Sequence, residues 1–113
     1  MATAKFIQTG DSIDYTPSSA VSAGNVVVQG ELVGVAKLDI AANALGALAV
    51  AGVFDFPKTA GQGKAIAAGA KVYWDVADAV AKTDDETGAN KLIGKTVAAA
   101  GDNDTKVRVR LSQ

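Results

Sequence analysis

The chain has 113 residues and a formal net charge of −1, from 11 basic and 12 acidic side chains, so we expect one domain with one hydrophobic core. It contains no histidine and no cysteine, which excludes Ser-His-Asp and Cys-His nucleophiles, disulfides and metal sites built on imidazole or thiolate. The balanced charge also argues against a nucleic-acid-binding protein, which normally carries a basic excess.

Alternation of apolar and polar residues, rather than a helical stripe, recurs along the chain, although alanine occupies 23 positions. Residues 105–111 alternate strictly, with valine or leucine at every second position and lysine or arginine between them, which is typical of a half-buried strand. Comparable short runs bounded by turn residues predict further strands. In chain order, the predicted strands cover residues 5–8, 12–16, 25–29, 32–38, 46–54, 71–75, 79–83, 92–99 and 105–111.

Turn signals separate these runs at intervals of about 8–12 residues, which favours an all-β fold. We expect residues 1–113 to form a small compact β-barrel or β-sandwich of about eight or nine short strands. At most one short helical turn is expected, near residues 64–68. The chain start has no apolar signal-peptide core, and its longest nearly uncharged apolar run, residues 40–54, is too short to span a bilayer. We therefore expect a soluble protein with no membrane partner.

A weak repeat relates the two halves of the sequence. The first copy comprises Ala23-Gly24, Val26-Val27-Val28, Leu32-Val33-Gly34 and Leu48-Ala49-Val50. The second comprises Ala68-Gly69, Val72-Tyr73-Trp74, Leu92-Ile93-Gly94 and Val107-Arg108-Val109, with an extra hairpin over residues 75–90. Either an ancient duplication or the general sameness of small β motifs explains this repeat.

Motifs for phosphate, metal or acid–base chemistry are incomplete. Gly61-Gln62-Gly63-Lys64 resembles a phosphate-binding loop, but lysine and alanine stand at positions 58 and 65, where that motif needs glycine and Ser or Thr. Asp84-Asp85-Glu86 lacks the spacing of a calcium loop and is expected at a solvated hairpin tip. No spacing brings Asp55 and Asp75 together as a glycosidase pair. We predict a non-enzymatic protein without a cofactor or metal site.

Two groups of side chains are candidates for contact with a partner. One face of the last predicted strand carries Lys106, Arg108 and Arg110. These cations either contact an acidic partner or form a solvated face that discourages aggregation. The aromatic residues fit either an interface or the core. Because Tyr73 and Trp74 are adjacent in a predicted strand, they must point to opposite faces, and one of them is expected in the core.

Seven short pieces carry a further signal through their order and spacing. They are Phe6-Ile7-Gln8-x-Gly10-Asp11-x-Ile13-x-Tyr15, Ser22-Ala23-Gly24-x-Val26-Val27-Val28, Leu32-Val33-Gly34-Val35-Ala36, Gly52-Val53-Phe54-Asp55-Phe56-Pro57-Lys58, Ile66-Ala67-Ala68-Gly69-x-x-Val72-Tyr73-Trp74-Asp75, Leu92-Ile93-Gly94 and Val107-Arg108-Val109-Arg110-Leu111. Together, over residues 4–111, they resemble a small family of tailed-phage proteins encoded beside major capsid genes, the capsid cement or head decoration proteins. Some members carry a recombinase label, which the incomplete phosphate loop of this chain contradicts.

The resemblance implies a non-enzymatic, β-rich virion protein, made in the host cytoplasm. It would bind the capsid exterior as a homotrimer, contact the major capsid protein and stabilise the expanded head. The alternatives are another phage structural protein, such as a trimeric fibre, spike or tail component, and a small-ligand or sugar-binding β module. Residues 1–8 are expected either to form an extended N-terminal arm that reaches the capsid or to pair within the protein's own sheet. The predicted capsid or subunit interface comprises Lys5, Phe6, Ile7, Phe54, Phe56, Tyr73, Trp74, Arg108 and Arg110.

Overall fold

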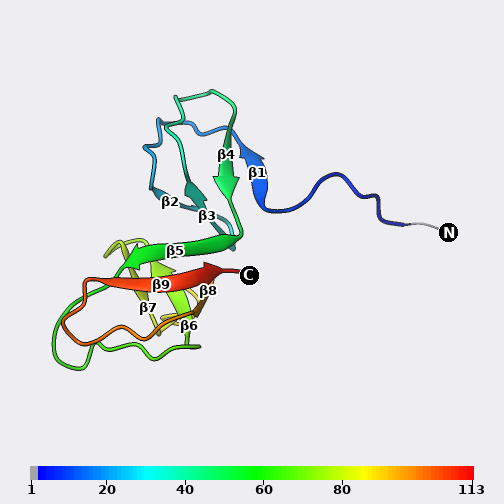
Figure 1. Ribbon diagram of the computed structural model, residues 1–113. Coiled ribbons are helices and arrows are strands. Elements are labelled where there is room, and N and C mark those ends of the chain that lie inside the picture. The colour runs from blue at the N-terminus through cyan, green and yellow to red at the C-terminus, as the bar shows by residue number, and fades with distance from the viewer. Residues whose placement is uncertain (1–2) are drawn as a thin grey trace.

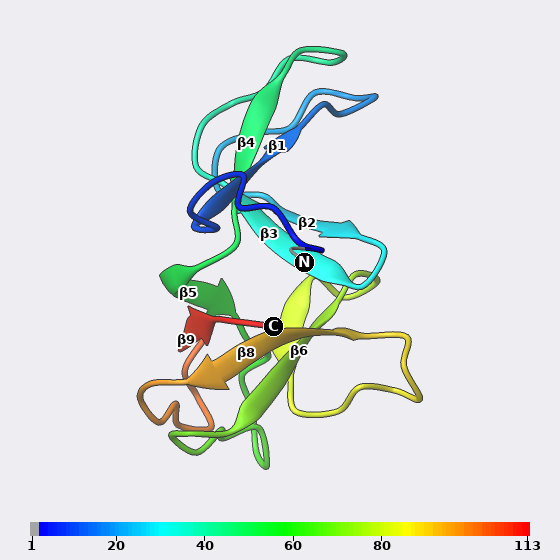
Figure 2. The ribbon, with the colours of Figure 1, turned by 90° about the vertical axis from the view of Figure 1, so that its right-hand side faces the viewer.

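Two antiparallel sheets make up the protein (Figures 1 and 2). The computed structural model describes residues 3–113. The first sheet has the order β1-β4-β3-β2 and contains β1 (Ser12–Tyr15), β2 (Val26–Gln29), β3 (Leu32–Ala36) and β4 (Gly46–Ala49). The second sheet has the order β5-β9-β8-β6-β7 and contains β5 (Gly52–Pro57), β6 (Lys71–Asp75), β7 (Val80–Lys82), β8 (Lys91–Thr96) and β9 (Lys106–Leu111).

The all-β prediction is confirmed, because residues 3–113 contain nine strands and no helix. The sheets do not close into a barrel, and their arrangement is sandwich-like. Within this part of the chain, no helix has the length and apolar character needed to cross a membrane.

Two local predictions were wrong. Residues 46–54 form two strands in different sheets instead of one, because the chain bends at Ala51 and Gly52 takes a φ of 121°, a conformation that side chains rarely allow. Residues 5–8 form no strand. The expectation of at most one helical turn, near residues 64–68, agrees with the structure: the segment contains none, and Ile66 there pairs with Ala100 through two backbone hydrogen bonds of 2.9 and 2.8 Å.

The main core lies inside the curved second sheet and extends to the first. From the first sheet, Val33 and Val35 of β3 are buried in this core, and Val26 and Val28 of β2 pack against it. The buried partners from the other half of the chain are Phe56, Ile66, Val72, Trp74, Ala81, Ile93, Ala100, Val107, Val109 and Leu111. Full burial of a large aliphatic or aromatic side chain contributes about 1.5–3 kcal/mol, so this shared core holds the two sheets together.

A second, smaller cluster covers the opposite face of the first sheet. It contains the buried side chains of Ala36, Ile40 and Leu48, with the partly buried Ile13, Tyr15, Val21 and Val27 packed against them. Strand β2 shows the division clearly, because Val26 and Val28 contact the main core whereas Val27 contacts the second cluster. This follows from the two-residue period of a strand, which sends successive side chains to opposite faces.

The two sheets repeat one arrangement, in line with the repeat in the sequence. In the first sheet, β1 pairs with β4 and β4 pairs with β3. In the second sheet, β5 pairs with β9 and β9 pairs with β8 in the same way. The strand that has no counterpart, β7, lies within the predicted extra hairpin. The matching backbone contacts are Gly24 N–H to Ala36 O and Gly69 N–H to Thr96 O, together with the bridges Val21 to Ile40 and Ile66 to Ala100.

Gly34 in β3 and Gly94 in β8 occupy corresponding positions of the two sheets. At each of these glycines the neighbouring strand comes very close to the backbone. A Cβ atom on Gly94 would lie 1.9 Å from the carbonyl oxygen of Arg110, on β9. A Cβ atom on Gly34 would lie 3.0 Å from the Cβ atom of Leu48, on β4. The contact at Gly94 is with backbone, so a side chain fits there only if β9 moves.

We predict that Gly94→Ala lowers the free energy of unfolding by about 3 kcal/mol or more, because the added methyl group overpacks the centre of the second sheet. Urea unfolding followed by circular dichroism measures the change. Gly10→Ala is the matched control, since nothing lies within 4 Å of a Cβ atom there. Equal stability of the two variants would contradict the close approach of β8 and β9.

Polar contacts also join the two sheets. The Gln113 side-chain amide donates from Nε2 to Val33 O at 2.9 Å, and its Oε1 accepts from Val33 N–H at 2.8 Å. The amide therefore replaces a strand partner for this residue of β3. Lys91, at the start of β8, forms an ion pair with Glu31, in the turn before β3.

Candidate interaction surfaces

The segment before β1 carries two strongly exposed apolar side chains. Residues 3–9 belong to neither sheet and lead away from the body of the protein (Figure 1). Phe6 is 81% exposed and Ile7 is 76% exposed, and Lys5 beside them is exposed as well. Gln8 links the segment to β1, because its Nε2 donates to Ser12 O at 3.0 Å. Two adjacent large apolar side chains in water are typical of a surface that contacts another molecule.

The four predicted aromatic residues divide between core and surface. Phe56 is 1% exposed and Trp74 is 7% exposed, and their ring centroids lie 6.0 Å apart in a tilted arrangement. Both side chains stabilise the main core and present no surface to a partner. Phe54 and Tyr73 are half-buried, and the expectation that one of the pair Tyr73 and Trp74 enters the core is confirmed.

Strand β9 has the predicted alternation, with buried apolar side chains at 107, 109 and 111 and exposed cations between them. Arg108 lies opposite Asp55 of β5 and donates from Nε to its Oδ1 at 2.9 Å. The hydrogen bond and charge of Arg108 lower the pKa of Asp55. Arg110 forms no ion pair among the described residues.

Two further lysines extend this basic face across the sheet. Arg110 is directly opposite Lys95 of β8, and Lys95 is directly opposite Lys71 of β6. All three side chains are exposed. Directly opposed residues of antiparallel strands share one face of the sheet, so Lys71, Lys95 and Arg110 form a row, which we call the basic row. The two lysines were not among the predicted interface residues, because only the strand register brings them together.

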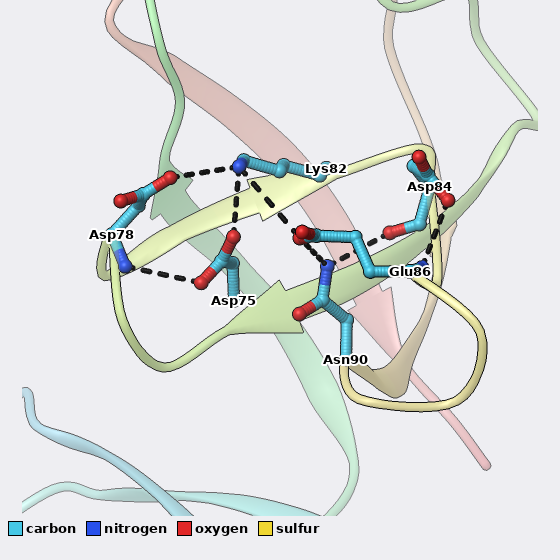
Figure 3. A network of polar contacts seen from close by, with 6 residues as sticks. All are labelled: Asp75, Asp78, Lys82, Asp84, Glu86 and Asn90. Carbon is cyan, nitrogen blue, oxygen red and sulfur yellow. Dashed lines mark hydrogen bonds and ion pairs between the residues drawn. The ribbon is translucent and has the colours of Figure 1, made fainter.

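A network of polar contacts occupies the end of the sheet at β6 and β7 (Figure 3). Lys82 Nζ lies 2.7 Å from Asp75 Oδ2, 2.8 Å from Asp78 Oδ2 and 3.8 Å from Glu86 Oε2. Asn90 is buried, and its Nδ2 donates to Asp84 O and to Glu86 Oε2, at 2.9 and 2.7 Å. These contacts explain the acidic residues around the hairpin as partners of Lys82 and of their own loop.

The same network controls the ionisation of Asp75. Hydrogen bonds from Lys82 and from the backbone N–H of Asp78 lower the pKa of Asp75 from its usual 3.8 to about 2. The pKa of Lys82 is raised in return, chiefly by Asp75. This pair therefore stabilises the fold while the Asp75 carboxylate is ionised.

Two open surface hollows, of about 320 and 690 Å³, bear on the sugar-binding alternative. The smaller is lined by parts of the glycine-rich loop, Lys58 and the network around Lys82, and the larger by β4 and the loop before it. Lys58 is itself buried, and its Nζ donates to the carbonyl oxygens of Thr59 and Asp104, at 2.9 and 3.0 Å. Neither hollow is lined by an aromatic side chain, so neither offers the stacking surface that sugar-binding sites use.

A comparison with protein-family models adds the deciding observation. The model for phage cement proteins matches residues 7–111, which cover both sheets. The chain belongs to the phage cement protein family. A comparison with curated proteins found no match, and neither did a comparison with solved structures.

For a phage cement protein, the exposed surfaces described above are candidate contacts with other proteins of the virion. The family is one of virion-associated structural proteins. Its members associate with a phage capsid, and association depends on surface chemistry rather than on an enclosed site. Two surfaces of this cement protein are candidates for such contacts: the exposed apolar residues of the N-terminal segment, and the exposed cations on the outward face of the second sheet.

We predict that this cement protein loses stability as the pH falls from about 4 to 2. The pKa of Asp75 is about 2 in the folded protein and 3.8 ordinarily. The ionised Asp75 therefore contributes fully to the stability of the fold above pH 3.8, and this contribution is lost as the pH falls to about 2. Asp75→Asn should unfold more easily at pH 7 and lose less of its remaining stability over this interval. Thermal unfolding at stepped pH tests this, with the exposed Asp85→Asn as the control. An unchanged acid profile for Asp75→Asn would contradict the prediction.

Proposed function

We propose that this protein binds the exterior of the expanded phage head and stabilises it by linking neighbouring subunits of the major capsid protein. Membership in the phage cement family is the observation that carries this proposal. A head presents many equivalent sites, so modest affinity at each site reinforces the shell through many links. Preferential binding to the expanded state stabilises that state by mass action.

The N-terminal segment is the first proposed contact with the capsid. Residues 3–9 pair with neither sheet, so their backbone is available to add a strand to an exposed sheet edge of a capsid subunit. Phe6 and Ile7 would then leave water for pockets on that subunit, and Lys5 would contribute a charge. The proposed arm extends over residues 1–8, of which residues 1–2 lie outside the described part of the chain.

The second sheet offers the other proposed contact. Arg108 and Arg110 are exposed on β9, and Phe54 and Tyr73 are half-buried. Phe54 packs against the main core, in which Phe56 and Trp74 are buried. We assign the exposed residues to contacts with the capsid or with other copies in a homotrimer.

Replacing Phe6 and Ile7 together by serine should weaken binding to heads by at least about tenfold, because apolar anchors usually dominate an interface. Purified protein is mixed with expanded, undecorated heads of its own phage, and co-sedimentation and heat resistance of the heads are measured. The variant should unfold at the wild-type temperature, since both side chains lie outside the sheets.

Leu38→Ser is the matched control for this experiment, because Leu38 is also a large apolar residue and is 77% exposed. Equal head binding by the double variant and the control would contradict the role of the arm. If the wild-type protein neither co-sediments with heads nor protects them from heat, the cement proposal itself is contradicted.

The homotrimer is tested separately. We expect multi-angle light scattering to give a mass three times that of the 11.3 kDa chain, for the free protein or for protein released from heads. A monomer in both samples contradicts the trimer, and open-ended rods in electron micrographs would favour a fibre or tail component.

A further inference from the structure

The basic row is an unusual feature for a sheet face. Lys71, Lys95 and Arg110 belong to three neighbouring strands and lie directly opposite one another in the register. Directly opposed residues have Cβ atoms about 4.5–5.5 Å apart, and like charges in such pairs destabilise a sheet. Lys95, between the other two, takes part in two of these unfavourable pairs.

No carboxylate in the described part of the chain compensates the basic row. Neither Lys71, Lys95 nor Arg110 forms an ion pair there. Asp55, on the neighbouring strand β5, is held by Arg108 through two hydrogen bonds, of 2.9 and 3.3 Å. The chain as a whole has a net charge of −1, so its excess of acidic groups lies on other surfaces.

We propose that the basic row is a docking surface for an acidic segment of a neighbouring virion protein. The proposal rests on the cement function and names the chemistry of the partner at this face. Carboxylates from such a segment would lie between the three cations and remove the repulsion that the free protein carries. Charge complementarity of this kind sets the orientation and rate of docking, and it weakens as salt is added.

A protein partner fits these observations better than a nucleic acid. Nucleic-acid platforms combine cations with stacking aromatic side chains, and the basic row contains none.

The proposal predicts opposite effects of one substitution on stability and on binding. Lys95→Gln removes the central charge and both like-charge pairs, so the free protein should melt about 2 °C higher. The same variant should bind undecorated heads about tenfold more weakly at low salt, and its binding should depend less on salt concentration. Lys37→Gln is the matched control, because Lys37 is an exposed lysine outside the second sheet, and neither quantity should change.

Two soluble probes complete the experiment without heads. Poly-L-glutamate should bind the wild-type protein at low salt and bind Lys95→Gln more weakly, whereas single-stranded DNA should bind neither. Unchanged binding of Lys95→Gln to both heads and poly-L-glutamate overturns the proposal, and so does tighter binding of the wild type to DNA than to poly-L-glutamate. If the wild type does not bind heads, the cement function fails, and the poly-L-glutamate result alone then decides the proposal.

Discussion

Strand β3 has to pack apolar side chains on both of its faces, and the remaining structure depends on this requirement. Val33 and Val35 enter the main core, which the second sheet encloses, while Ala36 packs in the cluster on the other face. Gly34, between the two valines, leaves room for Leu48 on the neighbouring strand. A strand buried on both sides must be apolar almost throughout, and here it joins two small sheets that share one core.

This packing determines which residues remain for contact with other molecules. Two large aromatic side chains of the second sheet, Phe56 and Trp74, are buried in the core. Its outward face carries the charged side chains of Arg108 and Arg110 beside Val53, which is 56% exposed and lies opposite Arg110. The exposed Phe6 and Ile7 lie in the segment outside the sheets.

The charged groups of the second sheet are arranged in two contrasting ways. Around Lys82, three carboxylates surround one ammonium group, and the low pKa of Asp75 reflects a stabilising contact. In the basic row, cations face cations, and stability is lost. The network around Lys82 stabilises the fold. The basic row is explained if a partner supplies the missing negative charges, because functional surfaces often reduce the stability of the free protein.

The sequence alone determined the features that depend on local pattern. The two-residue alternation at Val107, Val109 and Leu111 identified β9 and its exposed cations, because side chains of a strand alternate whatever its neighbours are. Turn residues located most strand ends, and the order of seven short pieces indicated the cement family. Only the tertiary structure showed that Trp74 rather than Tyr73 enters the core, and that Lys71 and Lys95 join Arg110. Both outcomes depend on where the core lies and on strand register, which are set by pairing between distant segments and not by local pattern.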